Sequence, residues 1–186
     1  MLEVLVALLI LLIGLLGLAG LLVTIQQGEV EAFQRKQATV LLQDVVDRIT
    51  ANRVSATCYA ITTNATNGAP ALGTGYGGSF VCGAGSVSQQ ARASADLQAW
   101  NDALLGTSEK KGSANVGAII DARGCITNPA TDVYTVSVAW RGLAPTVAPP
   151  AAYTCAKNQY TDSGGAADER LRRVISVTVR IANLTA

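Results

Sequence analysis

Histidine is absent from the 186-residue sequence, and charged residues are scarce. Without an imidazole, the chain cannot form a Ser-His-Asp triad or a zinc site that needs a histidine ligand. Charged residues make up 15% of the chain and the formal net charge is +1, so no strongly basic field attracts nucleic acid. We therefore expect a protein that is not an enzyme, holds no metal or other cofactor, and takes no small-molecule substrate.

Cysteine is also sparse, and its spacing argues against a metal site. The four cysteines lie 24, 43 and 30 positions apart and include no C-x-x-C pair. An even number favours two disulfides, formed in an oxidising compartment such as the periplasm or the cell exterior. Of the three possible pairings, we favour the two that join neighbours in the sequence, because each would close a loop rich in Gly, Pro, Asn and Ala. These pairs are Cys58 with Cys82 and Cys125 with Cys155; buried free thiols are the alternative.

The first 25 residues, MLEVLVALLILLIGLLGLAGLLVTI, contain one long apolar run. Residues 4–25 are 22 residues without any charge. As a helix they would extend about 33 Å, close to the roughly 30 Å of a bilayer's hydrocarbon layer. A cleaved signal peptide has a shorter apolar core that follows basic residues, whereas no Lys or Arg precedes this run. Residues 1–25 are therefore predicted to be a retained transmembrane helix.

Two features inside this run bear on assembly. Gly14, Gly17 and Gly20 recur at every third position and could leave a strip where another helix approaches closely. The alternative is that these glycines only loosen the helix. Glu3 is the single acid beside the apolar run, and taken alone it is explained by a place at the lipid headgroups.

The helix is predicted to continue through residues 26–53 as an amphipathic segment. No proline or turn cluster interrupts it, and two charge pairs recur at i,i+4 spacing, Glu31 with Arg35 and Asp44 with Arg48. The whole helix would have about 50 residues, and its second half needs a folded partner for one apolar stripe. That stripe comprises Phe33, Leu41, Val45 and Ile49.

Residues 54–186 are predicted to form a disulfide-containing globular ectodomain. The GTGYGG stretch at residues 73–78 lacks the Gly-Lys-Ser/Thr of a phosphate-binding loop, so it is interpreted as a surface loop. Residues 93–106 predict a short helix with Ser94 as N-cap and Gly106 at its end. Its buried face would contain Leu97, Trp100 and Leu104, with the tryptophan in the core.

The remaining regular structure is predicted to be strand. Residues 132–141 and 174–182 alternate apolar and polar side chains, and residues 116–121 and 124–127 are further candidates. The APTVAPP stretch at residues 144–150 cannot supply backbone donors and is predicted to be a loop. The sequence therefore indicates an α+β fold in which an antiparallel sheet packs on the amphipathic half of the long N-terminal helix.

Two segments together resemble a known family. The opening apolar run resembles the N-terminus of type IV pilins, and the segment QATVLLQDVVDRITANR at residues 37–53 is similar to the minor pilins of the PilV family, the type IV pilus modification proteins. The matching positions of the second segment are Gln37, Ala38, Asp44, Asp47, Arg48, Ala51, Asn52 and Arg53. The resemblance covers about the first 53 residues strongly and the remainder loosely.

The resemblance implies a pilin-like fold and a structural role. Such minor pilins join other minor pilins and the major pilin in a complex that primes pilus assembly, with a possible place at the filament tip and a role in adhesion, twitching motility or DNA uptake. It implies an inner-membrane protein with a periplasmic ectodomain before assembly and an extracellular pilus, or fimbrium, afterwards. Glu3 would pair with the N-terminal amine of a neighbouring subunit.

One expected feature of the family is missing. Its mature chains begin with a methylated residue two positions before the equivalent of Met1, after a glycine that marks the cleavage site. Neither residue is present. We expect that the sequence starts late; abnormal processing is the alternative.

Three other functions fit parts of the sequence. A minor pseudopilin of a type II secretion system would use the same helix, and a signal-anchored periplasmic domain would form no filament. A DNA-binding tip pilin could use an arginine cluster near the C-terminus, where Asp168 and Glu169 are interpreted as solvated charges. The cluster comprises Arg170, Arg172, Arg173 and Arg180.

Overall fold

The N-terminal helix is one uninterrupted element. The computed structural model describes residues 2–182, and α1 spans Leu2–Ala51, which are 50 residues. The chain forms two compact units that divide between Arg35 and Lys36, so α1 contributes to both of them. This boundary falls inside the predicted amphipathic segment. The single continuous helix predicted from the sequence is confirmed.

The C-terminal part of α1 supplies one wall of the core of the second unit. Its buried residues are Ala38, Leu42, Val45 and Ile49, at successive spacings of four, three and four that keep to one face of a helix. Leu41 is half-buried and packs against this core, as predicted, but Phe33 is 59% exposed, so the prediction that Phe33 belongs to the buried stripe is wrong. On the polar side, Arg48 contacts Asp44 at 2.9 Å, as predicted, and also Asp96 at 3.1 Å.

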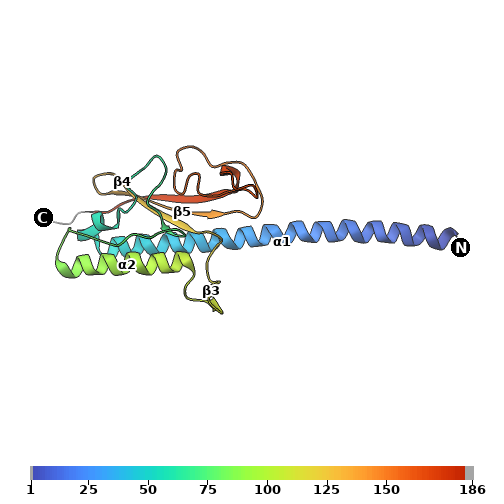
Figure 1. The fold of residues 1–186 in the computed structure, drawn as a ribbon, viewed down its shortest axis with the longest axis horizontal. Coiled ribbons are helices and arrows are strands. Elements are labelled where there is room, and N and C mark those ends of the chain that lie inside the picture. Colours follow the sequence, from blue (N-terminus) through green and yellow to red (C-terminus); the bar gives the residue numbers. More distant parts are fainter. Residues whose placement is uncertain (1, 183–186) are drawn as a thin grey trace. The chain divides into compact units, whose positions relative to one another are not determined.

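A second helix, α2 (Val87–Leu105), packs on the same core. It ends at Gly106, whose positive φ of 65° suits the left-handed cap, as predicted. Its predicted start at Ser94 is wrong, because Ser86 and Gln89 form a reciprocal capping box and Ser94 instead donates a hydrogen bond to the carbonyl of Phe80. In Figure 1, α2 runs beside the C-terminal part of α1, joined to it by a 2.9 Å hydrogen bond from Trp100 Nε1 to the Leu41 carbonyl. The predicted buried face is confirmed for Leu97, Trp100 and Leu104.

A four-stranded antiparallel sheet completes the core, which confirms the α+β, pilin-like fold. Its order is β1-β4-β5-β6, formed by β1 (Leu72–Gly73), β4 (Arg123–Ala130), β5 (Val133–Arg141) and β6 (Arg172–Arg180). In β5 the predicted apolar side chains Tyr134, Val136, Val138 and Trp140 are all buried, and all four belong to the same cluster as the buried residues of α1 and α2. A separate hairpin pairs β2 (Lys110–Lys111) with β3 (Ala114–Asn115). Two 3₁₀ helices, η1 (Arg53–Tyr59) and η2 (Glu169–Leu171), follow α1 and precede β6.

Two details of the predicted sheet are wrong. Residues 116–121 form no strand. Ile119 is buried in the core. The backbone N–H of Arg141 donates a hydrogen bond to the carbonyl of Ile120, but this contact does not extend into strand pairing. The short apolar run packs beside the end of α2, where Gly106 approaches Ala118 too closely for any larger residue. The predicted surface loop at residues 73–78 begins inside the sheet, because Gly73 pairs with Arg123. The predicted loop at residues 144–150 has no regular structure, as expected.

Two disulfides hold the second unit together. Cys58 is bonded to Cys82, with their Cα atoms 5.2 Å apart, and Cys125 to Cys155, with their Cα atoms 5.8 Å apart. This is the pairing that the loop composition favoured. The first bridge ties η1 to the segment before α2, and the second ties β4 to the segment between β5 and β6.

Removing the second disulfide should lower stability measurably. The Cys125→Ala, Cys155→Ala double variant releases a bridge between residues 30 positions apart. Because the bridge restricts the unfolded chain, we expect the free energy of unfolding to fall by about 2–4 kcal/mol. Urea titration of the full chain in detergent, followed by tryptophan fluorescence, measures this change. Thr131→Ala in the exposed β4–β5 turn is the control, and a midpoint equal in the double variant and the control would contradict the prediction.

Candidate functional site

The apolar first half of α1 is the largest unexplained surface of the chain. The large apolar side chains of residues 4–25 are 48–72% exposed, although they are the residues that water solvates least favourably. Within residues 2–182, α1 is the one helix long and apolar enough to cross a membrane, and its apolar window is not buried against the rest of the chain. This segment has the length and composition of a membrane anchor or a signal sequence. Its surface needs lipid or other apolar protein around it.

Glu3 lies in the first turn of this helix. A carboxylate at that position interacts favourably with the partial positive charge of the unpaired N–H groups at a helix start. Lipid headgroups would also solvate it. If the helix were instead surrounded by other apolar helices, the ionised carboxylate would be costly without a cationic partner.

The three predicted helix-packing glycines have open space around them. A β-carbon added at Gly14, Gly17 or Gly20 would meet nothing within 4 Å. Successive residues of this set are rotated by about 60° around the helix, so the glycines occupy about a third of its circumference. Glycine inside a helix costs about 0.5–1 kcal/mol relative to alanine, and no packing among residues 2–182 offsets that cost. Their use, if they have one, lies in contacts with another molecule.

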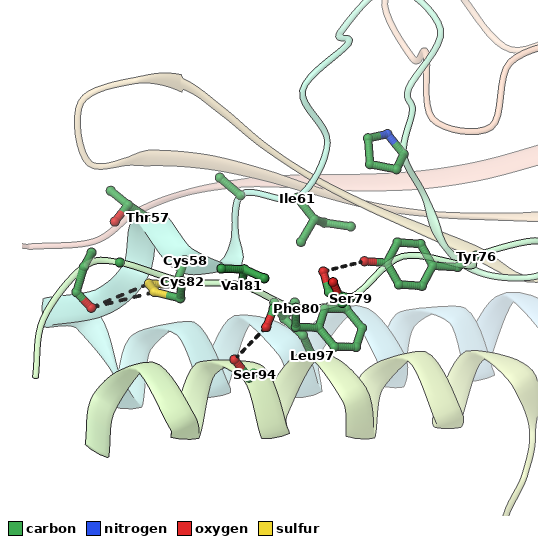
Figure 2. Close-up of a pocket in the computed structure, with 14 residues that line it drawn as sticks. Thr57, Cys58, Ile61, Tyr76, Ser79, Phe80, Val81, Cys82, Ser94 and Leu97 are labelled. Carbon is green, nitrogen blue, oxygen red and sulfur yellow. Dashed lines mark hydrogen bonds between the residues drawn. A yellow bond between two sulfur atoms is a disulfide. The ribbon is translucent and has the colours of Figure 1, made fainter. Parts of the chain in front are cut away.

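A cavity of about 330 Å³ lies beside the Cys58–Cys82 disulfide (Figure 2). The disulfide stands at one end, and the rings of Tyr76 and Phe80 stack at the other with their centroids 5.3 Å apart. Ser94 donates to the Phe80 carbonyl across the opening. The wall carries no charged side chain, so it offers apolar and hydroxyl contacts and no acid-base pair.

The four arginines near the C-terminus do not form one basic surface, which corrects the sequence prediction. Arg172 is buried and forms an ion pair with Glu169, so neither Arg172 nor Glu169 is a solvated charge. Arg180 is exposed at the other end of β6, about 26 Å along the strand from Arg172. Arg173 donates to the carbonyls of Ala144 and Arg170.

Among the arginines next to Arg172, Arg170 keeps the exposure predicted for the cluster. Its guanidinium is exposed and contacts Asp168 at 2.9 Å. The hydrogen bonds from the side chain and the backbone of Arg170 hold the pKa of the Asp168 carboxyl below its usual value. One exposed cation that is already paired with an acid offers little attraction for a phosphate backbone.

Sequence analysis missed Arg123, the first residue of β4, which lines a second cavity. The residues around it come from three separate stretches of the chain, so no local motif marks the site. The only sequence signal is a cation placed next to a strand of apolar residues.

The described residues contain no group of three or more Cys, Asp or Glu side chains that could hold a metal ion. Comparisons of the chain with protein-family models, with curated proteins and with solved structures give no match. The arrangement therefore has to be interpreted from its own chemistry: a long exposed apolar helix that enters a disulfide-bonded α+β unit.

Proposed function

We propose that the protein is a filament subunit, a minor pilin that takes part in assembling a type IV pilus. One observation carries the proposal: a single helix has residues 4–25 uncharged and exposed, while residues 38–49 of the same helix supply part of a folded core. A cleavable signal sequence has no need to be continuous with a core helix. A filament subunit needs this continuity, because the same helix must hold the folded unit and pack among neighbouring subunits.

The proposed partners are other minor pilins and the major pilin. Before assembly, the apolar half of α1 would lie in the inner membrane with the disulfide-bonded unit in the periplasm, where both disulfides can form. After assembly, the same half would lie among apolar helices, and the protein would be part of an extracellular filament. The proposed role is structural rather than enzymatic, and adhesion or twitching motility would follow from the filament.

Glu3 gives this proposal its sharpest test. In a bundle of apolar helices its carboxylate is stable only beside a cation, and the N-terminal amine of a neighbouring subunit is the proposed one. We expect Glu3→Gln to reduce the amount of this protein in sheared surface filaments by about tenfold or more, since one lost charge pair of about 1.4 kcal/mol already changes an equilibrium tenfold. Quantitative mass spectrometry of sheared filaments and of the membrane fraction measures the change.

Glu29→Gln is the matched control, because it makes the same chemical change at an exposed position of the same helix beyond the apolar run. It should leave incorporation unchanged. Equal incorporation of wild type and Glu3→Gln into filaments would contradict the proposed role of Glu3 in assembly. If wild type is absent from filaments and remains in the membrane, the protein is an anchored domain or a secretion pseudopilin, and the proposal fails.

A further inference from the structure

A second cavity, of about 500 Å³, opens beside the glycine-rich loop of the second unit. Its wall is formed by four parts of the chain: residues 67–71, residues 74–79, Arg123, and Ala156 with Gln159. Cavities of about 300–1,000 Å³ are typical of sites for small organic ligands, and this volume exceeds the needs of an inorganic ion.

Arg123 has fewer partners than a half-buried arginine needs. Its Nε donates a 3.1 Å hydrogen bond to the Thr74 carbonyl, and its guanidinium lies over the ring of Tyr160, 5.2 Å from the centroid. Its Nη1 is buried without any hydrogen-bond acceptor among residues 2–182. The Arg123 side chain also makes a hydrogen-bond interaction with the side chain of Tyr160, so its partners there are neutral groups. It also forms no ion pair within the described part of the chain.

The charge of the cavity wall is therefore uncompensated. The wall contains one cation, Arg123, and no carboxylate. A partly desolvated charge is costly when nothing opposite meets it, and a tyrosine face offsets only part of that cost. An anion in the cavity would supply the missing partner.

The geometry favours a carboxylate with hydroxyl groups around it. With Nε engaged and Nη1 covered by protein atoms, Nη2 is the guanidinium nitrogen left for a ligand, and its charge-assisted hydrogen bond suits a carboxylate oxygen. Gly75 lines the cavity with only a hydrogen atom, and a β-carbon there would lie 3.9 Å from Nη2. The other polar side chains of the wall are neutral, Asn67, Thr74, Ser79 and Gln159, and Tyr76 adds an aromatic ring. Neutral amides and hydroxyls beside a ring suit a sugar, and a single cation suits a single negative charge.

We propose that this cavity binds an acidic sugar, with the carboxylate on Nη2 of Arg123 and the sugar hydroxyls on Asn67 and Gln159. A nucleic acid would require several cations, whereas the wall has one. The proposal does not depend on filament assembly, because every residue of the site lies in the second unit of a single chain.

Saturation-transfer NMR on the full chain in detergent tests the proposal with matched ligands. The probes are galacturonate, glucuronate and N-acetylneuraminate, each compared with its neutral counterpart. We expect at least one acid to bind with Kd of about 1 mM or tighter, and its neutral counterpart at least about tenfold more weakly. Arg123→Gln should abolish this binding, and Arg123→Lys should weaken it because an ammonium group reproduces neither the position of Nη2 nor the hydrogen bond that holds Nε to Thr74. Arg180→Gln, which removes an exposed cation at the far end of β6, should leave it unchanged.

Several outcomes would overturn the proposal. The first is that none of the three acids binds at concentrations up to about 20 mM, which lies far above the expected Kd. The second is equal binding of the acid and the neutral sugar. The third is that folded Arg123→Gln still binds the acid. Acetate binding as tightly as the acidic sugar would indicate an unspecific anion site. Equal binding of a blocked glutamate peptide would indicate a protein carboxylate as the natural ligand. If Arg123→Gln fails to give the near-ultraviolet circular dichroism of wild type, the comparison of acid with neutral sugar and the Arg123→Lys variant decide the matter.

Discussion

Replacing Trp100 with alanine is expected to lower the free energy of unfolding by about 3–5 kcal/mol. The indole is fully buried and joins α2 to the C-terminal part of α1 and to β4. It lies so close to β4 that a β-carbon at Gly124 would collide with the ring. Truncation removes a large apolar side chain, leaves a cavity between these elements, and breaks the hydrogen bond to Leu41.

Two variants separate these contributions. Trp100→Phe loses the hydrogen bond and part of the volume but keeps an aromatic ring, so we expect a smaller loss, of about 1–2 kcal/mol. Val87→Ala, at an exposed position of the same helix, should change stability by less than about 0.5 kcal/mol. Urea unfolding in detergent, followed by near-ultraviolet circular dichroism, measures all three. A loss for Trp100→Ala no greater than that for Val87→Ala would contradict the placement of the indole in the core.

Replacing Glu169 with alanine is expected to cost about 3–5 kcal/mol, although the residue lies near the surface. Its carboxylate is the ionic partner of Arg172, with Oε2 2.5 Å from Nη2 and 2.7 Å from Nε. The Arg172 side chain is 1% exposed, so the variant would leave a buried cation without its counter-charge. The remaining contacts of Arg172, to the carbonyls of Tyr153 and Cys155 at 2.7 and 3.1 Å, cannot neutralise it.

The double variant Glu169→Ala, Arg172→Met isolates the charge effect. Because methionine fills much of the same space without a charge, we expect it to recover most of the stability that Glu169→Ala loses. Asp168→Ala is the neighbouring control. It removes the ion pair with exposed Arg170 and the cap of η2 but leaves no buried charge unpaired, so we expect a smaller loss, of about 1–2 kcal/mol. Thermal unfolding monitored by tryptophan fluorescence gives the comparison. A double variant less stable than Glu169→Ala would mean that Arg172 acts through its carbonyl contacts instead.

The parts of the fold that sequence predicted are those with a strong, repeated pattern. α1 is fixed by an apolar run followed by helical periodicity, and β5 by large apolar side chains at every second position, although residues 136–140 are all buried. The start of α2 was missed because its first turns carry few apolar residues, so no periodicity marks them. The pattern of Ser86 and Gln89, three positions apart, was the available signal.

Arg172 could not have been predicted from its neighbours. It stands in a run of five residues, ERLRR, that has the composition of a solvated surface. Its burial depends on Tyr153 and Cys155, which reach it from the segment between β5 and β6. Such a contact is set by tertiary structure and leaves no local trace.

Some of the candidate site residues could be found from the sequence, and others only from the folded structure. Glu3 and the glycines of α1 are visible in the sequence because the uniform apolar run makes them conspicuous, yet their proposed contacts lie in other molecules. Arg123 is the opposite case. Its surroundings come from stretches more than 30 residues away on either side, and only the folded chain brings them together.

The Cys125–Cys155 bridge also determines how the protein would respond to cleavage by a protease. Most of residues 143–153, between β5 and this bridge, are exposed and irregular, with Val147 90% exposed, so a protease can cut here. Any such cut falls between the two bonded cysteines. The two pieces would stay covalently joined, and β5 would remain paired with β6 along nine residues. A nicked molecule would thus persist as a two-chain protein that separates only when it is both reduced and unfolded.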